Sequence, residues 1–178
     1  MAKKAKAPLQ SHGRKSVPKP AKAASRAGSN AGRGFRYQDA VSAWLAIEIW
    51  AGRRPPASVI PEGGDDIELR GEATDYVQVK SRREHLGDYT EGEAVGHLEE
   101  LWNRSLASSP RPDRLELVLE REAVGLAIVE EQSPTRLIGG PIRTRLSRFT
   151  EAGDLLRRTS ATVATSPQEW AIKLITDR

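Results

Sequence analysis

Apolar residues recur along this chain with two different periods, and these periods predict its secondary structure. Helical spacing, every three or four positions, runs through residues 37–50, 91–107, a stretch that starts at Pro141, and residues 167–178. The period of two that is typical of a half-buried strand runs through residues 66–70 and 75–80. Shorter runs predict strands at residues 58–60, 115–119 and 161–164, whereas residues 123–129 fit either a strand or a helix.

Turn-forming residues separate these segments. Gly52 and the pair Pro55-Pro56 end the first helix. Gly71 and Glu72 suit a tight turn, so we expect the strands on either side of them to pair as a hairpin. The resulting order is helix, three strands, helix, strand, helix, strand, helix. It predicts an α/β domain in which helices flank a mixed β-sheet.

The charge distribution divides the chain in two. Residues 1–30 contain eight Lys or Arg, no acid and almost no large apolar side chain, whereas the remaining 148 residues carry 20 basic and 24 acidic residues, a net charge of −4. A segment of the first kind cannot bury enough apolar surface to offset the entropy lost on ordering. We therefore expect a disordered, Lys-rich N-terminal arm at residues 1–30 and one folded domain at residues 31–178. The N-terminal arm suits contacts with nucleic-acid phosphates, but it suits a solubilising tail without a partner equally well.

Several classes of protein are disfavoured by the composition. The chain has no cysteine, so it forms no disulfide, thiolate zinc site or thiol nucleophile. No apolar run approaches the ~20 residues of a membrane-spanning helix, and the N-terminus lacks the apolar core of a secretory signal. The sequence also lacks a P-loop and a nucleophile elbow. We expect a cytoplasmic protein with no membrane partner.

Polar residues that can hold a metal gather around the predicted hairpin. Gln78 and Lys80 project from the same face of one strand, and Asp66 begins the neighbouring strand, about 4.8 Å away. Glu62 and Asp65 precede that strand, and Glu48 on the first helix could border the same cleft. Mg²⁺ prefers such oxygen ligands, and a lysine beside it can stabilise charge on a phosphate. Acids and a lysine at strand ends are also ordinary solvated groups, so the spacing alone does not establish a metal site.

The joint pattern resembles a known nuclease family. Residues 34–38 read Gly-Phe-Arg-Tyr-Gln and open a helix, residues 61–69 read Pro-Glu-Gly-Gly-Asp-Asp-Ile-Glu-Leu, and residues 76–81 read Tyr-Val-Gln-Val-Lys-Ser. Together they resemble the N-terminal double-stranded DNA endonuclease domain of bacterial anti-phage effectors associated with CD-NTases. That domain belongs to the PD-(D/E)XK, or restriction-endonuclease-like, superfamily. The motifs cover residues 30–110, and the rest of the chain resembles the family only in the order of its elements.

The resemblance implies a role for each matched residue. Asp66 would bind the metal, Gln78 would replace the more common glutamate, and Lys80 would be the catalytic lysine; Glu62 and Asp65 match acidic positions of less defined role, and which of the two neighbouring aspartates binds the metal stays open. The implied cofactor is Mg²⁺ or Mn²⁺, held more weakly than by a site with a glutamate. The N-terminal arm and the segment after the second hairpin strand would contact DNA, through Lys3, Lys4, Lys6, Arg14, Lys15, Arg82 and Arg83.

Two functions follow as expectations. The first is a Mg²⁺-dependent endonuclease that cleaves double-stranded DNA in prokaryotic defence, acts as an oligomer and is controlled by a C-terminal or separate sensor or NTPase module. The second is a catalytically silent nucleic-acid-binding or assembly module of the same fold. The set of Asp66, Gln78 and Lys80 favours the first, and the acidic body favours the second, because nucleases usually present a basic groove.

Overall fold

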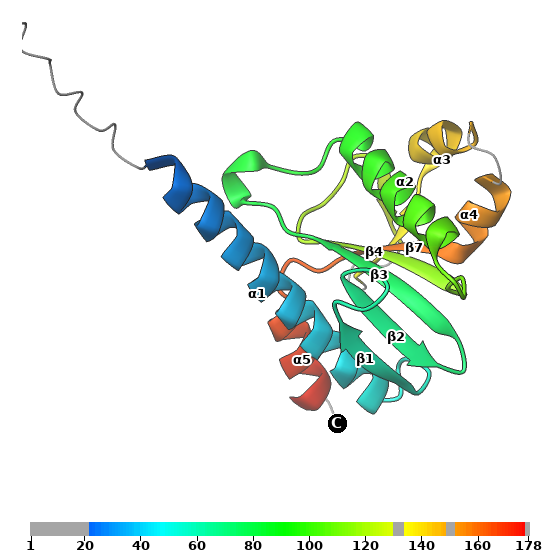
Figure 1. The fold of residues 1–178 in the computed structure, drawn as a ribbon, viewed down its shortest axis with the longest axis horizontal. Helices are drawn as coiled ribbons and strands as arrows, with labels where there is room; N and C mark the ends of the chain where they lie inside the picture. Colours follow the sequence, from blue (N-terminus) through cyan, green and yellow to red (C-terminus); the bar gives the residue numbers. More distant parts are fainter. Residues whose placement is uncertain (1–21, 130–133, 149–151, 177–178) are drawn as a thin grey trace, which may run out of the picture.

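The computed structural model describes residues 22–129, 134–148 and 152–176 (Figure 1). Its helices are α1 (Lys22–Trp50), the 3₁₀ turn η1 (Glu84–Leu86), α2 (Glu91–Ala107), α3 (Gly140–Leu146), α4 (Ala152–Arg158) and α5 (Pro167–Thr176). Its strands are β1 (Ala57–Pro61), β2 (Ile67–Gly71), β3 (Thr74–Lys80), β4 (Arg114–Leu119), β5 (Leu126–Ile128), β6 (Thr135–Ile138) and β7 (Thr159–Val163). Within the described residues, no helix combines the length and the apolar character needed to cross a bilayer.

The described strands form one seven-stranded sheet in the order β1-β2-β3-β4-β7-β6-β5. Strands β1, β2 and β3 are antiparallel neighbours, β4 and β7 run parallel to β3, and β6 and β5 are antiparallel again. The predicted hairpin is the β2–β3 pair, in which Ile67 lies opposite Val77. The prediction of an α/β domain with a mixed sheet is therefore confirmed, and the architecture is consistent with a restriction-endonuclease-like core.

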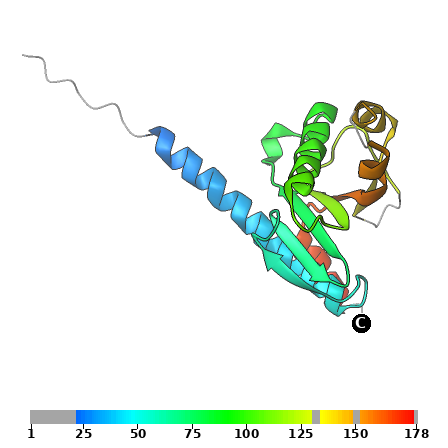
Figure 2. The ribbon, with the colours of Figure 1, turned by 45° about the vertical axis from the view of Figure 1, so that its right-hand side comes forward.

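Helices cover both faces of the sheet, as the prediction requires. Figures 1 and 2 show α1 and α5 side by side on one face, and α2, α3 and α4 on the other. The α1 face packs around fully buried Trp44, Leu45 and Val77, and the α2 face packs around Leu98, Leu101 and Leu117. Strand β3 contacts both helical layers, because Val77 packs in the core under α1 and Tyr76 packs in the core under α2.

The first helix is longer than the apolar pattern predicts. The expected helix begins near Tyr37, but α1 begins at Lys22, so residues 22–30, which were expected to be disordered, are helical. The reason is propagation: once the packed part of a helix has formed, further residues add at little cost, and this segment contains three alanines together with Lys22 and Arg26, all of which favour a helix. Residues 1–21, the rest of the N-terminal arm, lie outside the described part of the chain.

The C-terminal half contains two elements that the sequence did not predict. Strand β6 pairs with β7, and only Ile138 of its four residues is buried, so its pattern carries little signal. Helix α4 has seven residues and precedes β7 directly. The ambiguous residues 123–129 form the short strand β5 at their centre.

Candidate active site

The β2–β3 hairpin brings Asp66 to the end of β3. Asp66 directly precedes β2, and its carboxylate Oδ2 accepts a hydrogen bond from the backbone N–H of Val79 at 2.7 Å. Its backbone carbonyl accepts a second bond from Gln38 Nε2 of α1 at 2.6 Å. Asp66 is therefore fixed between helix α1 and strand β3. Its partner on β3, Val79, lies between Gln78 and Lys80.

Gln78 is the least expected residue of this region. Its exposed fraction is 0%, yet neither Oε1 nor Nε2 has a hydrogen-bond partner among the described residues. Buried amides are almost always paired, because an unpaired polar group costs roughly 1–3 kcal/mol. Gln78 lies on the same face of β3 as Tyr76, which belongs to the core under α2. An amide with unused hydrogen-bonding capacity therefore faces the α2 side of the sheet.

A series of ion pairs connects Lys80 of β3 to helix α2 and to Asp65. Its Nζ lies 3.1 Å from Glu100 Oε2, and Glu100 Oε1 lies 2.6 Å from an Arg104 terminal nitrogen. The other terminal nitrogen of Arg104 lies 2.6 Å from Asp65 Oδ1. Opposite charges thus alternate from the end of β3, across α2, to the loop that precedes β2.

Asp65 is the buried end of this chain. Its side chain is 0% exposed, and Oδ1 also accepts the backbone N–H of Asp66 at 2.9 Å. The second oxygen, Oδ2, has no hydrogen-bond partner among the described residues. Burial raises the pKa of the Asp65 carboxyl; Arg104 counteracts this shift, Asp66 adds to it, and Lys80 opposes it. Asp65 is thus as much a part of the candidate site as Asp66.

The loop before β2 needs its glycines to place Asp65. A Cβ added at Gly64 would lie 2.0 Å from the ring of Tyr76, and one at Gly63 would lie 2.6 Å from Glu68 Cβ. The loop therefore packs directly on β2 and β3 because these two positions have no side chain. Glu62, in the same loop, is exposed and has a φ of 55°, and its carboxylate makes no hydrogen bond or ion pair with the described residues.

Glu48 does not join this cluster. Its Oε2 lies 2.6 Å from Arg54 Nε, and Arg54 also pairs with buried Glu116 at 2.8 Å. Thr162 donates a hydrogen bond to Glu116 at 2.7 Å, which completes a network on the opposite, α1 face of the sheet. Burial opposes the charge of Glu116, but Arg54 and Thr162 keep its pKa below the ordinary value. The expectation for Glu48 was wrong because Gln38 and Glu48 are separated by about 15 Å along α1, at 1.5 Å per residue.

The arginines after β3 are already engaged within the protein. Arg82 pairs with Glu93 at 2.7 Å, donates to the carbonyls of Gly87 and Leu86, and stacks over the ring of Tyr89. Arg83 lines a pocket beside this stack, together with Arg33, Ser81, Arg82, Leu86 and Tyr89. Arg82 thus holds the turn around η1, and a DNA contact would have to share it. The other predicted DNA contacts, Lys3, Lys4, Lys6, Arg14 and Lys15, lie outside the described residues.

Two residues of the candidate site, Glu100 and Arg104, were not predicted from the sequence. Glu100 and Arg104 are four residues apart on α2 and pair with each other, which is the ordinary pattern of a solvated helix face. Their spacing in sequence does not distinguish this pair from others on exposed helices. Only the packing of α2 over β3 places them against Lys80 and Asp65.

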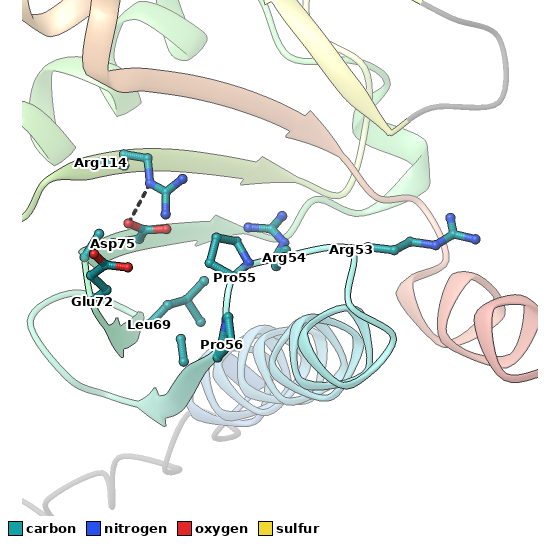
Figure 3. Close-up of a pocket in the computed structure, with 10 residues that line it drawn as sticks. Arg53, Arg54, Pro55, Pro56, Leu69, Glu72, Asp75 and Arg114 are labelled. Carbon is teal, nitrogen blue, oxygen red and sulfur yellow. Dashed lines mark hydrogen bonds and ion pairs between the residues drawn. The ribbon is translucent and has the colours of Figure 1, made fainter.

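A second hollow on the surface lies away from these residues. Figure 3 shows this pocket at the start of β3, where Arg114 pairs with Asp75 at 2.9 Å near Arg53, Arg54 and Glu72. Lys80 ends the same strand, about 17 Å from Asp75 at ~3.3 Å per residue. The pocket and the candidate site are therefore distinct.

The site contains oxygen atoms of the chemical kind that a hard divalent cation binds. The unpaired atoms include Gln78 Oε1 and Asp65 Oδ2, and Mg²⁺ prefers such oxygen ligands. No three His, Cys, Asp or Glu side chains of the described residues are grouped so as to hold a metal. A metal at this position would therefore depend on the amide oxygen of Gln78 together with the carboxylates of Asp65 and Asp66.

Comparison with known proteins adds no relative to this picture. The chain matches no protein-family model, no curated protein and no solved structure.

Proposed function

We propose that this chain is a Mg²⁺- or Mn²⁺-dependent endonuclease that hydrolyses phosphodiester bonds of double-stranded DNA. The observation that carries the proposal is the buried amide of Gln78, which has no hydrogen-bond partner among the described residues and lies two residues before Lys80. Asp66 accepts the N–H of Val79, the residue between these two. A buried polar group without a partner in the protein is explained where a bound ligand interacts with it. The resemblance of these same residues to the PD-(D/E)XK motif supports the proposal independently of the geometry.

Each residue has a role in this proposal that its contacts support. Asp65, Asp66 and Gln78 would supply oxygen ligands, and Asp66 is held in place by Gln38 and by the N–H of Val79. When bound, Mg²⁺ would lower the pKa of a coordinated water and neutralise phosphate charge. Lys80 would stabilise negative charge that develops on the phosphate, and its ammonium pairs with Glu100 at 3.1 Å.

The biological setting is proposed from the resemblance alone. The family implies an anti-phage effector that acts as an oligomer under a sensor or NTPase module. The basic residues of the N-terminal arm would add an electrostatic contact to DNA, which the net charge of −4 on the rest of the chain does not favour.

A second candidate function is a catalytically silent nucleic-acid-binding or assembly module. One observation favours it: Lys80 and Arg104 already neutralise the carboxylates of Glu100 and Asp65 within the protein. A protein whose site groups only stabilise one another would need no metal.

Plasmid cleavage separates the two candidates. Supercoiled plasmid is incubated with wild-type protein in Mg²⁺ or in EDTA, and with Lys80→Met and Asp66→Asn in Mg²⁺. Asp66→Asn keeps an acceptor for the Val79 N–H, so its fold should persist. The matched control is Arg114→Gln, which removes an ion pair at the far end of β3.

Endonuclease function predicts nicked and linear products only with wild type and Arg114→Gln in Mg²⁺. Intact plasmid in every reaction would support the silent module, and equal cleavage by Lys80→Met would contradict the assigned site.

A further inference from the structure

Arg104 places a permanent positive charge between two carboxylates of the candidate site. One terminal nitrogen lies 2.6 Å from Asp65 Oδ1 and the other lies 2.6 Å from Glu100 Oε1. Both nitrogens belong to one planar guanidinium, so the two carboxylates are held on either side of a single cationic group. A guanidinium between two carboxylates occupies the position that a bridging cation would take.

The two partners of Arg104 differ in their surroundings. The Arg104 side chain is 45% exposed and reaches Asp65 from the solvent side, whereas the Asp65 side chain is fully buried. Asp65 still has an unpaired oxygen, and both amide atoms of Gln78 are unpaired as well. Arg104 therefore compensates the charge of Asp65. It leaves Asp65 Oδ2 and the Gln78 amide without a hydrogen-bond partner among the described residues.

We propose that Arg104 is a tethered stand-in for a divalent cation, and that the ion and Arg104 compete for Asp65 and Glu100. This inference rests on the proposed function, because it concerns the same metal site. Its consequence is that metal binding moves the Arg104 guanidinium outward and recruits Glu100 as a further carboxylate. The flexible, half-exposed side chains of Arg104 and Glu100 allow that exchange without moving the backbone of α2.

Direct metal binding tests the competition without any cleavage assay. Full-length protein is titrated with Mn²⁺, and free Mn²⁺ is measured by electron paramagnetic resonance for wild type, Arg104→Gln, Glu100→Gln and Arg114→Gln. The control Arg114→Gln also removes one arginine from an ion pair, and its side chain is 52% exposed, close to that of Arg104. Thermal unfolding in EDTA establishes that each variant is folded.

Competition predicts that Arg104→Gln binds Mn²⁺ more tightly than wild type, by about twofold to fivefold, the range expected for losing one partly exposed charge partner. Glu100→Gln should bind Mn²⁺ more weakly, although Arg104 keeps its partner Asp65, and Arg114→Gln should match wild type. In EDTA, Arg104→Gln should unfold at a lower temperature than wild type, and saturating Mn²⁺ should remove that difference.

The outcomes separate this inference from the proposed function. Equal or weaker Mn²⁺ binding by Arg104→Gln, with clear binding by wild type, would overturn the competition and leave the metal site intact. An absence of Mn²⁺ binding by every variant would overturn both.

Discussion

At the level of single residues, Gln78 has an environment that is unusual for a polar side chain. The amide is buried in a strand between core residues, and neither of its polar atoms is paired among the described residues. A side chain selected only for stability would be apolar here. The unpaired amide therefore fits the proposal that this position serves binding at the expense of stability.

Gln78→Met should stabilise the protein. The two side chains are similar in length, and the substitution removes two unsatisfied polar atoms, so we expect the free energy of unfolding to rise by about 1–3 kcal/mol. Urea unfolding in EDTA measures the change. Gln38→Met is the matched control: it removes an amide that donates to Asp66 and should lower stability. A loss of stability in Gln78→Met would mean that the amide has a partner in the folded protein.

The sequence predicts part of this site for a simple reason. Period-two alternation places Gln78 and Lys80 on one face, and the Gly71–Glu72 turn places Asp66 beside them, so local geometry is sufficient. Glu100 and Arg104 depend on the angle at which α2 crosses the sheet, a tertiary quantity that residue spacing does not give. Glu48 is a different case, because a helix rises about 1.5 Å per residue and the positions of Gln38 and Glu48 in the sequence already place them about 15 Å apart.

At the scale of the element, helix α2 begins with a charged capping box. The Thr90 hydroxyl accepts the N–H of Glu93 at 3.2 Å, the Glu93 carboxylate accepts the N–H of Thr90 at 2.8 Å, and Arg82 pairs with the same carboxylate. The hydrogen bond from Arg82, followed by those from Thr90, lowers the pKa of Glu93 to about 2. The ion pair between Arg82 and Glu93 therefore joins the start of α2 to the segment that follows β3.

The stability that Glu93 provides should depend on pH in a defined direction. Its folded-state pKa lies below the ordinary value of 4.5, so the carboxylate stabilises the fold fully above pH 4.5, and this contribution is lost as the pH falls towards about 2. The difference in unfolding temperature between wild type and Glu93→Gln should shrink across that range. A difference that stays constant from pH 6 to pH 2 would show that the charge of Glu93 is not responsible. Glu99→Gln, on the same helix but outside the capping box, serves as the control.

The network of Arg54 joins the end of α1 to β4 and β7. Arg54→Met should lower the free energy of unfolding by about 3–5 kcal/mol, because buried Glu116 would lose its cationic partner. Glu48→Gln should cost less, since the pair of Arg54 with Glu116 remains. Urea unfolding gives both values. Equal losses in the two variants would show that Glu116 is not the group that needs Arg54.

The long elements were predicted because their periodicity extends over several turns or a full strand. Helix α2 has the predicted bounds, β3 and β4 each begin one residue earlier than predicted, and β2 is shifted by one residue at both ends. Strand β6 and helix α4 were missed because each is short and partly exposed, and β6 is ordered by pairing with β7 rather than by its own pattern.

Across the whole molecule, the cluster of basic residues near the N-terminus lies in a different part of the chain from the β-sheet. The sheet and its two helical layers belong to the acidic part of the chain, and six basic residues lie in residues 2–21. The α/β class was predictable because it needs only the order of elements. How the N-terminal arm relates to DNA is a question of electrostatics rather than of fold.

Removal of residues 2–21 should weaken DNA binding and reduce its dependence on salt. Each phosphate that the protein no longer neutralises should lower the slope of log affinity against log salt by about 0.9. Fluorescence anisotropy with a short duplex, at several salt concentrations, measures both quantities. A full-length chain with the six basic residues replaced by glutamine should behave like the truncated chain. Identical slopes for all three proteins would mean that the N-terminal arm does not touch phosphate.

The central claim is that the Gln78 amide oxygen is a metal ligand, and Gln78→Glu tests it most directly. The two side chains are nearly isosteric, and a hard cation binds a carboxylate more strongly than an amide oxygen. Without metal, the added charge would repel the carboxylates of Asp65 and Asp66 and lower stability. With metal bound, the cation compensates that charge.

The measurement is a Mg²⁺ titration of plasmid cleavage by wild type, Gln78→Glu and Gln78→Ala. If Gln78 binds the metal, Gln78→Glu reaches half of its maximum rate at a lower Mg²⁺ concentration than wild type, and Gln78→Ala needs a higher one. The maximum rate of Gln78→Glu is expected to fall, because a more neutralised ion is a weaker Lewis acid. The same half-saturating Mg²⁺ concentration for all three proteins would contradict the account.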